Sequence, residues 1–191
     1  MNYSKISQKT ANYIAREIKL DNEKQEIIAF AVEILILGAV GFLLILGVGA
    51  LFNVAVPAFV AAIAGGFLRK LSGGAHFNSP VKCLAFGTVV YITIGIFIKY
   101  LAQANALGIN IVHYFIILIF SLILVAVYAP VDSEAKPIRS RVLRKRLKLA
   151  SIVFVIAVML FVMFIDIKII QLSVVLGVFY QSLTLLPVFN H

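Results

Sequence analysis

One histidine and one cysteine lie seven residues apart in a short polar segment, and this pair is the part of the chain best suited to chemistry. A cysteine attacks a carbonyl carbon as its thiolate, which a helix N-terminus, a neighbouring cation and a histidine partner all favour. Ser79 followed by Pro80 is typical of a helix N-cap and first helical position, so Cys83 is expected in a first helical turn beside Lys82. His76 is then a candidate to take the thiol proton and to deliver one to a leaving amine.

The spacing of this pair sets a geometric condition. A straight helix through both residues would separate them by about 10 Å along its axis, which is too far for proton transfer. Gly73, Gly74 and Asn78 are residue types that let the chain fold back, so an interrupted segment is expected between His76 and Cys83. The alternative is that Cys83 is a small apolar packing residue and His76 a solvated loop residue.

Cysteine usage limits the other possibilities. The chain has a single cysteine, which excludes an intramolecular disulfide. One cysteine with one nearby histidine is also too few ligands for a structural zinc site. We therefore expect no metal and no cofactor.

The composition indicates that the pair is positioned by membrane helices. Of 191 residues, 62% are hydrophobic and 13% charged, against roughly 45–50% and about 25% in soluble domains. A spanning helix needs about 20 apolar residues. Residues 27–68 hold one charged side chain, Glu33, and are long enough for two helices with a break near 47–53. With further apolar runs at 83–102, 110–129, 149–165 and 169–187, the sequence predicts an all-α polytopic integral membrane protein with about six transmembrane helices.

The chain divides into an N-terminal segment, 1–26, and a membrane domain, 27–191. The N-terminal segment mixes basic and acidic residues and lacks the apolar core of a cleavable signal. Its apolar residues recur at helical spacing, which favours an amphipathic helix in the membrane interface, with a solvated arm as the alternative. Two polar connections are expected in the membrane domain, a candidate catalytic loop at 69–83 and a basic loop at 130–148.

The basic residues predict the orientation. Of 17 Lys and Arg residues, five lie in the N-terminal segment, three in the loop 69–83 and seven between 136 and 148, which leaves only Lys99 and Lys168 elsewhere. Because cytoplasmic connections carry the excess of Lys and Arg, both termini and the candidate site are expected on the cytoplasmic side of the cell membrane.

Two charged features have a structural and a functional interpretation. Glu33 in the first span either extends toward the interface or helps to orient His76 or dock a substrate. The basic run that begins at Lys136 sets topology and touches anionic lipid head groups, or it holds an acidic peptide. Nucleic-acid binding is not expected, because no aromatic residues are interleaved with this run.

Three motifs, spread over the whole length, resemble one family. The first runs from Arg69-Lys70 through Gly74-Ala75-His76 to Cys83, the second is Tyr128-Ala129-Pro130 followed by Lys136-Pro137-Ile138, and the third is Thr184-Leu185-Leu186-Pro187. In these motifs, in its length and in its N-terminal segment, the chain resembles the AgrB family of membrane-embedded cysteine endopeptidases. That family processes the AgrD precursors of quorum-sensing peptides in Gram-positive bacteria.

The resemblance implies roles for particular residues. The family's catalytic pair corresponds to His76 and Cys83, and its functionally important arginine and glycine correspond to Arg69 and Gly74. It further implies a homodimer and a peptide precursor with an amphipathic leader and an acidic tail. An acyl-thioester would form on Cys83, and a Cys or Ser of the peptide would close a thiolactone or lactone ring. Backbone N–H groups near Cys83 or the Asn78 side chain are candidate oxyanion donors.

Two other classes of function stay open. A small membrane transporter would place polar residues in the middle of its spans, and these spans hold few of them. A non-catalytic membrane scaffold would tolerate replacement of Cys83 without loss of function.

Overall fold

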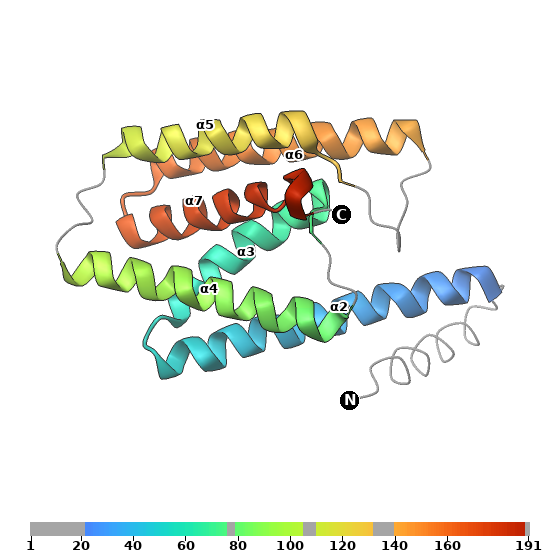
Figure 1. The fold of residues 1–191 in the computed structure, drawn as a ribbon, viewed down its shortest axis with the longest axis horizontal. Coiled ribbons are helices and arrows are strands. Elements are labelled where there is room, and N and C mark those ends of the chain that lie inside the picture. The colour runs from blue at the N-terminus through green and yellow to red at the C-terminus, as the bar shows by residue number, and fades with distance from the viewer. Residues whose placement is uncertain (1–21, 76–78, 105–109, 132–139, 190–191) are drawn as a thin grey trace. The chain divides into compact units, whose positions relative to one another are not determined.

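The computed structural model describes residues 22–75, 79–104, 110–131 and 140–189, all of which form helices and short connections (Figure 1). The helices are α2 (Asn22–Leu51), α3 (Ala55–Ser72), α4 (Pro80–Gln103), α5 (Ile111–Tyr128), α6 (Arg141–Phe164), α7 (Lys168–Leu183) and the short 3₁₀ helix η1 (Pro187–Phe189). Most of the N-terminal segment for which an interfacial helix was expected lies outside the described residues. The chain divides after Leu43 into two units, each of which is described by itself.

The six α-helices agree with the prediction of a polytopic membrane protein. Five of them contain an apolar stretch of at least 18 residues, which is long enough to cross a bilayer. The exception is α7, whose 16 residues extend about 24 Å at 1.5 Å per residue. Large apolar side chains point outward along these helices, as with Phe164, which is 84% exposed. An exterior of this kind suits lipid as the surrounding solvent.

The break between the first two spans lies where the sequence predicted it. Asn53 has a φ of 55°, and the Val54 N–H donates to the Gly49 carbonyl at 2.7 Å. A Cβ built on Gly49 would lie 2.8 Å from the Ala55 Cα, so the turn needs glycine at this position. The hairpin between α2 and α3 is therefore tight.

Two helix ends differ from the expected boundaries. The last helix, α7, ends at Leu183, before the end of the apolar run 169–187, and α6 begins at Arg141, inside the segment 130–148 that was expected to be a loop. Ser140 caps α6, because its side chain accepts a hydrogen bond from the Leu143 N–H at 3.3 Å. Lys and Arg are good helix formers, so a basic run favours a helix as readily as a loop.

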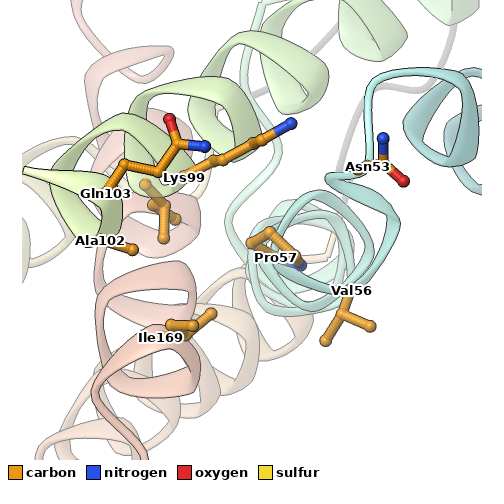
Figure 2. Close-up of a pocket in the computed structure, with 8 residues that line it drawn as sticks. Asn53, Val56, Pro57, Lys99, Ala102, Gln103 and Ile169 are labelled. Carbon is orange, nitrogen blue, oxygen red and sulfur yellow. The ribbon is translucent and has the colours of Figure 1, made fainter.

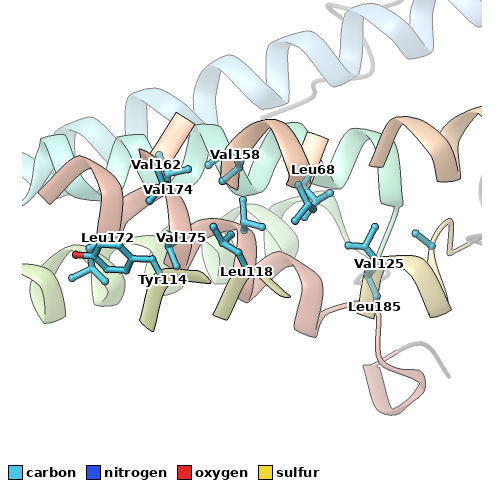
Figure 3. Packing of buried hydrophobic residues seen from close by; sticks show 14 of the residues in the cluster. Leu68, Tyr114, Leu118, Val125, Val158, Val162, Leu172, Val174, Val175 and Leu185 are labelled. Atoms are coloured by element: carbon cyan, nitrogen blue, oxygen red, sulfur yellow. The ribbon is translucent and has the colours of Figure 1, made fainter. Parts of the chain in front are cut away.

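Helix α7 is central to the second unit. It packs against α3, α4, α5 and α6, and α3 in turn packs against α4 and α6 (Figure 1). The core contains Leu68 of α3, Leu118 and Val125 of α5, Val158 of α6 and Val175 of α7 (Figure 3). This packing brings the C-terminal end of α7 to the end of α3 and to the connection that follows it.

The approach of α3 and α7 depends on small residues. A Cβ built on Gly177 of α7 would run into the backbone carbonyl of Ala61 on α3. A Cβ on Gly65 of α3 would in turn lie 2.8 Å from the Gly177 carbonyl oxygen. Close backbone contact through Gly and Ala is the usual way in which membrane helices gain packing energy.

Candidate functional site

The chain between α3 and α4 does not form a continuous helix. An interruption here is the condition that the sequence analysis set for chemistry at His76 and Cys83. Helix α3 ends at Ser72, and Gly73 and Gly74 follow with φ values of 70° and 134°. L side chains rarely adopt these conformations, so the two glycines let the chain leave the helix axis. His76 and Asn78 lie outside the described residues, and their roles stay predictions.

Cys83 lies in the first turn of α4, as predicted. Ser79 occupies the N-cap position with extended backbone, and the Cys83 N–H donates to the Ser79 carbonyl at 3.1 Å. The Ser79 side chain makes no capping hydrogen bond within the described part of the chain, so the predicted position is confirmed without the side-chain cap. The Cys83 thiol is half-buried and close to the positive end of the helix dipole.

Arg69 in the last turn of α3 contacts this thiol. Its guanidinium nitrogen Nη2 lies 3.6 Å from Cys83 Sγ and also donates to the Ala75 carbonyl. The guanidinium therefore places a cation at hydrogen-bond distance from the sulfur. The sequence analysis had assigned this role to the adjacent Lys82, which is exposed. The contact instead comes from a residue on the preceding helix, and the neighbouring Lys70 lies over the Phe67 ring, 5.8 Å from its centroid.

Two tyrosines lie near the Arg69–Cys83 pair. Tyr91 of α4 and Tyr180 of α7 form an edge-to-face pair with ring centroids 5.7 Å apart and an angle of 81° between the rings. Both lie within electrostatic range of Arg69 and Cys83. A Cβ on Gly65 would meet the Tyr91 hydroxyl, so α3 leaves room for this ring.

The end of α7 holds the connection that follows α3. The Ala75 N–H donates to the Thr184 carbonyl at 3.1 Å, and the Gln181 side-chain nitrogen Nε2 donates to the Gly73 carbonyl at 2.8 Å. Gly74 is buried between them, and a Cβ there would lie 2.6 Å from Thr184 Oγ1 and 2.9 Å from Gln181 Nε2. Any side chain at position 74 would therefore displace the connection or the end of α7.

The second motif reaches the same connection from another direction. The Val131 N–H, just after Tyr128-Ala129-Pro130, donates to the Ser72 carbonyl at 2.9 Å. A Cβ on Gly73 would run into the Val131 carbonyl. Described residues of the first and third motifs and the residue that follows Tyr128-Ala129-Pro130 therefore meet at one end of the bundle.

The roles proposed from the sequence for Glu33 and Lys136 stay predictions. Glu33 is partly exposed on α2 in the first unit, and Lys136 lies outside the described residues. Gln181 was missed by the sequence analysis, although a polar residue near the end of an apolar run was a signal for it. Among the described side chains, no three His, Cys, Asp or Glu residues gather as metal ligands would.

Two pockets of the bundle are lined by residues other than the thiol. A cavity of about 400 Å³ at the far ends of α3 and α4 is lined by Pro57, Lys99 and Ile169 among others (Figure 2). The Lys99 ammonium donates to the Phe52 carbonyl at 2.9 Å. A second cavity of about 300 Å³ lies between the end of α5 and the basic start of α6. Neither is lined by Arg69 or Cys83.

These features define an all-helical polytopic membrane protein whose one thiol is held where the ends of α3, α4 and α7 meet. The family model for AgrB, accessory gene regulator B, matches residues 7–185 of this sequence. The chain belongs to the AgrB family.

Similarity to individual family members extends over nearly the full length. An AgrB-like protein 2 of Clostridium perfringens is 31% identical over 198 residues, covering 97% of this chain and 92% of that protein. Accessory gene regulator protein B of Staphylococcus aureus is 26% identical over 191 residues, covering 99% of this chain and 97% of that protein. No solved structure matches this chain.

Proposed function

We propose that this protein is a membrane-embedded cysteine endopeptidase that cleaves an AgrD-like peptide precursor with Cys83 as nucleophile and His76 as general acid and base. The observation that carries the proposal is the Arg69 guanidinium at 3.6 Å from Cys83 Sγ, at the first turn of a helix. A neighbouring cation and a helix N-terminus are the surroundings in which nucleophilic cysteines are found. Membership of the AgrB family supports the same activity.

The reaction would proceed by acyl transfer in two steps. The Cys83 thiolate attacks the scissile carbonyl carbon, the C–N bond breaks, and the leaving amine takes a proton from His76. A thiol or hydroxyl of the bound peptide then gives its proton to His76 and attacks the resulting thioester, which closes a thiolactone or lactone ring and releases the Cys83 thiolate. Loss of the cleaved tail draws the first step forward.

The thioester must be protected from water until the ring closes. Cys83 is half-buried, and the connection beside it is tied to α7 through Gly73 and Ala75. A partly buried position of this kind limits the access of water and slows hydrolysis of a reactive intermediate. Binding of the precursor's amphipathic leader at the membrane interface would bring the scissile bond to the same level.

The orientation in the membrane and the partners are inferred from the distribution of basic residues and from membership of the AgrB family. We place the site on the cytoplasmic side, because the basic residues of this chain concentrate in segments expected there. The basic run before and within the start of α6 is the complement of an acidic peptide tail. A homodimer is the expected assembly.

The test is precursor cleavage in proteoliposomes that contain the full chain. Wild type is expected to cleave a peptide with an amphipathic leader and an acidic tail, whereas Cys83→Ala and His76→Ala fold and insert but do not cleave. His113→Ala is the matched control, because His113 is exposed at the start of α5, at the other end of that helix from Val131. Cleavage by Cys83→Ala at the wild-type rate would refute the peptidase and favour a scaffold or a transporter.

A further inference from the structure

The end of α7 and its C-cap residue Thr184 contact the chain after α3 through two side chains and one backbone carbonyl. Gln181 Nε2 donates to the Gly73 carbonyl at 2.8 Å, and the Thr184 carbonyl accepts from the Ala75 N–H at 3.1 Å. The Gln181 side chain and the Thr184 hydroxyl also enclose Gly74. Residues that are 108 positions apart in sequence are thereby joined.

The burial of Gln181 shows that packing alone does not account for this residue. The side chain is 0% exposed, and its carbonyl oxygen Oε1 accepts no hydrogen bond from the residues that the structure describes. A methionine of similar size would fill the same space without a buried amide. What the glutamine adds is the hydrogen bond from Nε2 to Gly73.

That hydrogen bond acts on the thiol through a short series of contacts. Gly73 and Gly74 have wide backbone freedom, so the position of Ala75 depends on what holds these glycines. The Ala75 carbonyl accepts from the Arg69 guanidinium, and the same nitrogen, Nη2, contacts Cys83 Sγ. The Arg69 guanidinium is thus oriented by the segment that Gln181 holds.

We propose that Gln181 is a positioning residue, which fixes the Gly73–Ala75 segment so that the Ala75 carbonyl holds the Arg69 guanidinium against the Cys83 sulfur. Its importance for catalysis rests on the proposed peptidase function, but its effect on the thiol does not. Since Thr184 holds Ala75 independently, loss of the Gln181 hydrogen bond weakens the arrangement without abolishing it.

The reactivity of Cys83 toward iodoacetamide measures this arrangement directly, because the chain has one cysteine and the reaction needs no substrate. In the full chain in proteoliposomes at neutral pH, Gln181→Met is expected to alkylate about fivefold more slowly than wild type, the effect of one hydrogen bond. Arg69→Gln removes the cation itself and is expected to slow alkylation about tenfold. Gln181→Met should add little in the Arg69→Gln background, since both changes act through the same contact.

Gln171→Met is the matched control. Gln171 is also a buried glutamine of α7, but it lies near the opposite end, where its Nε2 donates to the Val162 carbonyl of α6 at 2.9 Å. This variant should alkylate at the wild-type rate. Gln181→Leu, which also removes the N–H donor and adds no other, should resemble Gln181→Met.

The outcomes separate this proposal from the peptidase function. Wild-type alkylation rates in both folded Gln181 variants would overturn the proposal, and so would an undiminished effect of Gln181→Met in the Arg69→Gln background. In precursor cleavage, Gln181→Met should lower kcat with little change in KM, because the substrate contacts are retained. If Cys83→Ala still cleaves, the peptidase function fails while the alkylation result stands.

Discussion

The Arg69 guanidinium joins two segments that the sequence separates, because the same nitrogen contacts the Ala75 carbonyl and the Cys83 sulfur. At this scale the candidate site is a thiol, a cation and a backbone segment with two glycines at positive φ. Each glycine is required by a different neighbouring group. Gly73 lies against the Val131 carbonyl, whereas Gly74 lies against the side chains of Gln181 and Thr184.

Gly74 is the residue whose replacement should be most damaging to the backbone of the site. Gly74→Ala puts a Cβ 2.6 Å from Thr184 Oγ1 at a φ of 134°, and strain with overpacking of this kind costs about 1–3 kcal/mol. We expect cleavage of the precursor peptide to fall more than tenfold, with slower alkylation of Cys83. Gly66→Ala on α3 is the control, because a Cβ there meets nothing within 4 Å.

Cleavage and alkylation by Gly74→Ala at the rates of Gly66→Ala would contradict the assignment of Gly74 to this close contact. Thermal unfolding of both variants in detergent separates loss of the fold from a local change at the site.

At the scale of helices, the position of the site follows from the central place of α7. This helix packs closely on α3 through Gly177 and Ala61, and its C-terminal end then reaches the Gly73–Ala75 segment. In a bilayer the helices gain little from burying apolar surface against one another, so close packing and interhelical hydrogen bonds carry more of the stability.

The α3–α7 contact should therefore be sensitive to one added methyl group. Gly177→Ala would bring a Cβ against the Ala61 carbonyl, and we expect it to lower the free energy of unfolding by about 1–3 kcal/mol. Gly87→Ala on α4 should be neutral or slightly stabilising, because its Cβ meets nothing within 4 Å and Ala favours helix over Gly. Unfolding in mixed micelles with increasing denaturing detergent measures the difference. Equal stability of the two variants would mean that α3 can shift away from α7 at no cost.

The spans and the position of Cys83 could be predicted from the sequence, because apolar length, helix caps and glycines act locally. The partner of the thiol could not, since Arg69 and Cys83 are 14 residues apart on different helices. The contact of Gln181 with Gly73 joins positions 108 residues apart and has no periodic signature. The start of α6 was missed because a run of Lys and Arg suits an aqueous loop and an exposed helix equally well.

At the scale of the whole molecule, charge predicts how the bundle sits in the membrane. The end of α3 that carries Arg69 meets the chain just after α5 through Ser72 and Val131. The end of α5 shares a cavity with the basic start of α6, whereas Lys99 lies near the opposite end of α4. The positive-inside rule therefore predicts that the thiol lies on the cytoplasmic side.

The native cysteine allows this orientation to be measured. A membrane-impermeant maleimide should label Cys83 in inverted membrane vesicles and not in right-side-out vesicles. Gln103→Cys in a Cys83→Ser background should give the reverse pattern, because Gln103 is exposed at the other end of α4. Labelling of Cys83 from the outside would contradict the predicted orientation.

The most direct test of the central claim, that Cys83 is an acyl-accepting nucleophile, is the intact mass of the protein during turnover. A precursor peptide whose internal Cys or Ser is replaced by Ala cannot close the ring, so the acyl-enzyme should accumulate. We predict a mass increase on the wild-type chain equal to the mass of the N-terminal peptide fragment less one water. Hydroxylamine should remove this adduct because it cleaves thioesters, and Cys83→Ala should show no increase. Cleavage of this peptide with no adduct on wild type, and at the same rate by Cys83→Ala, would contradict the account.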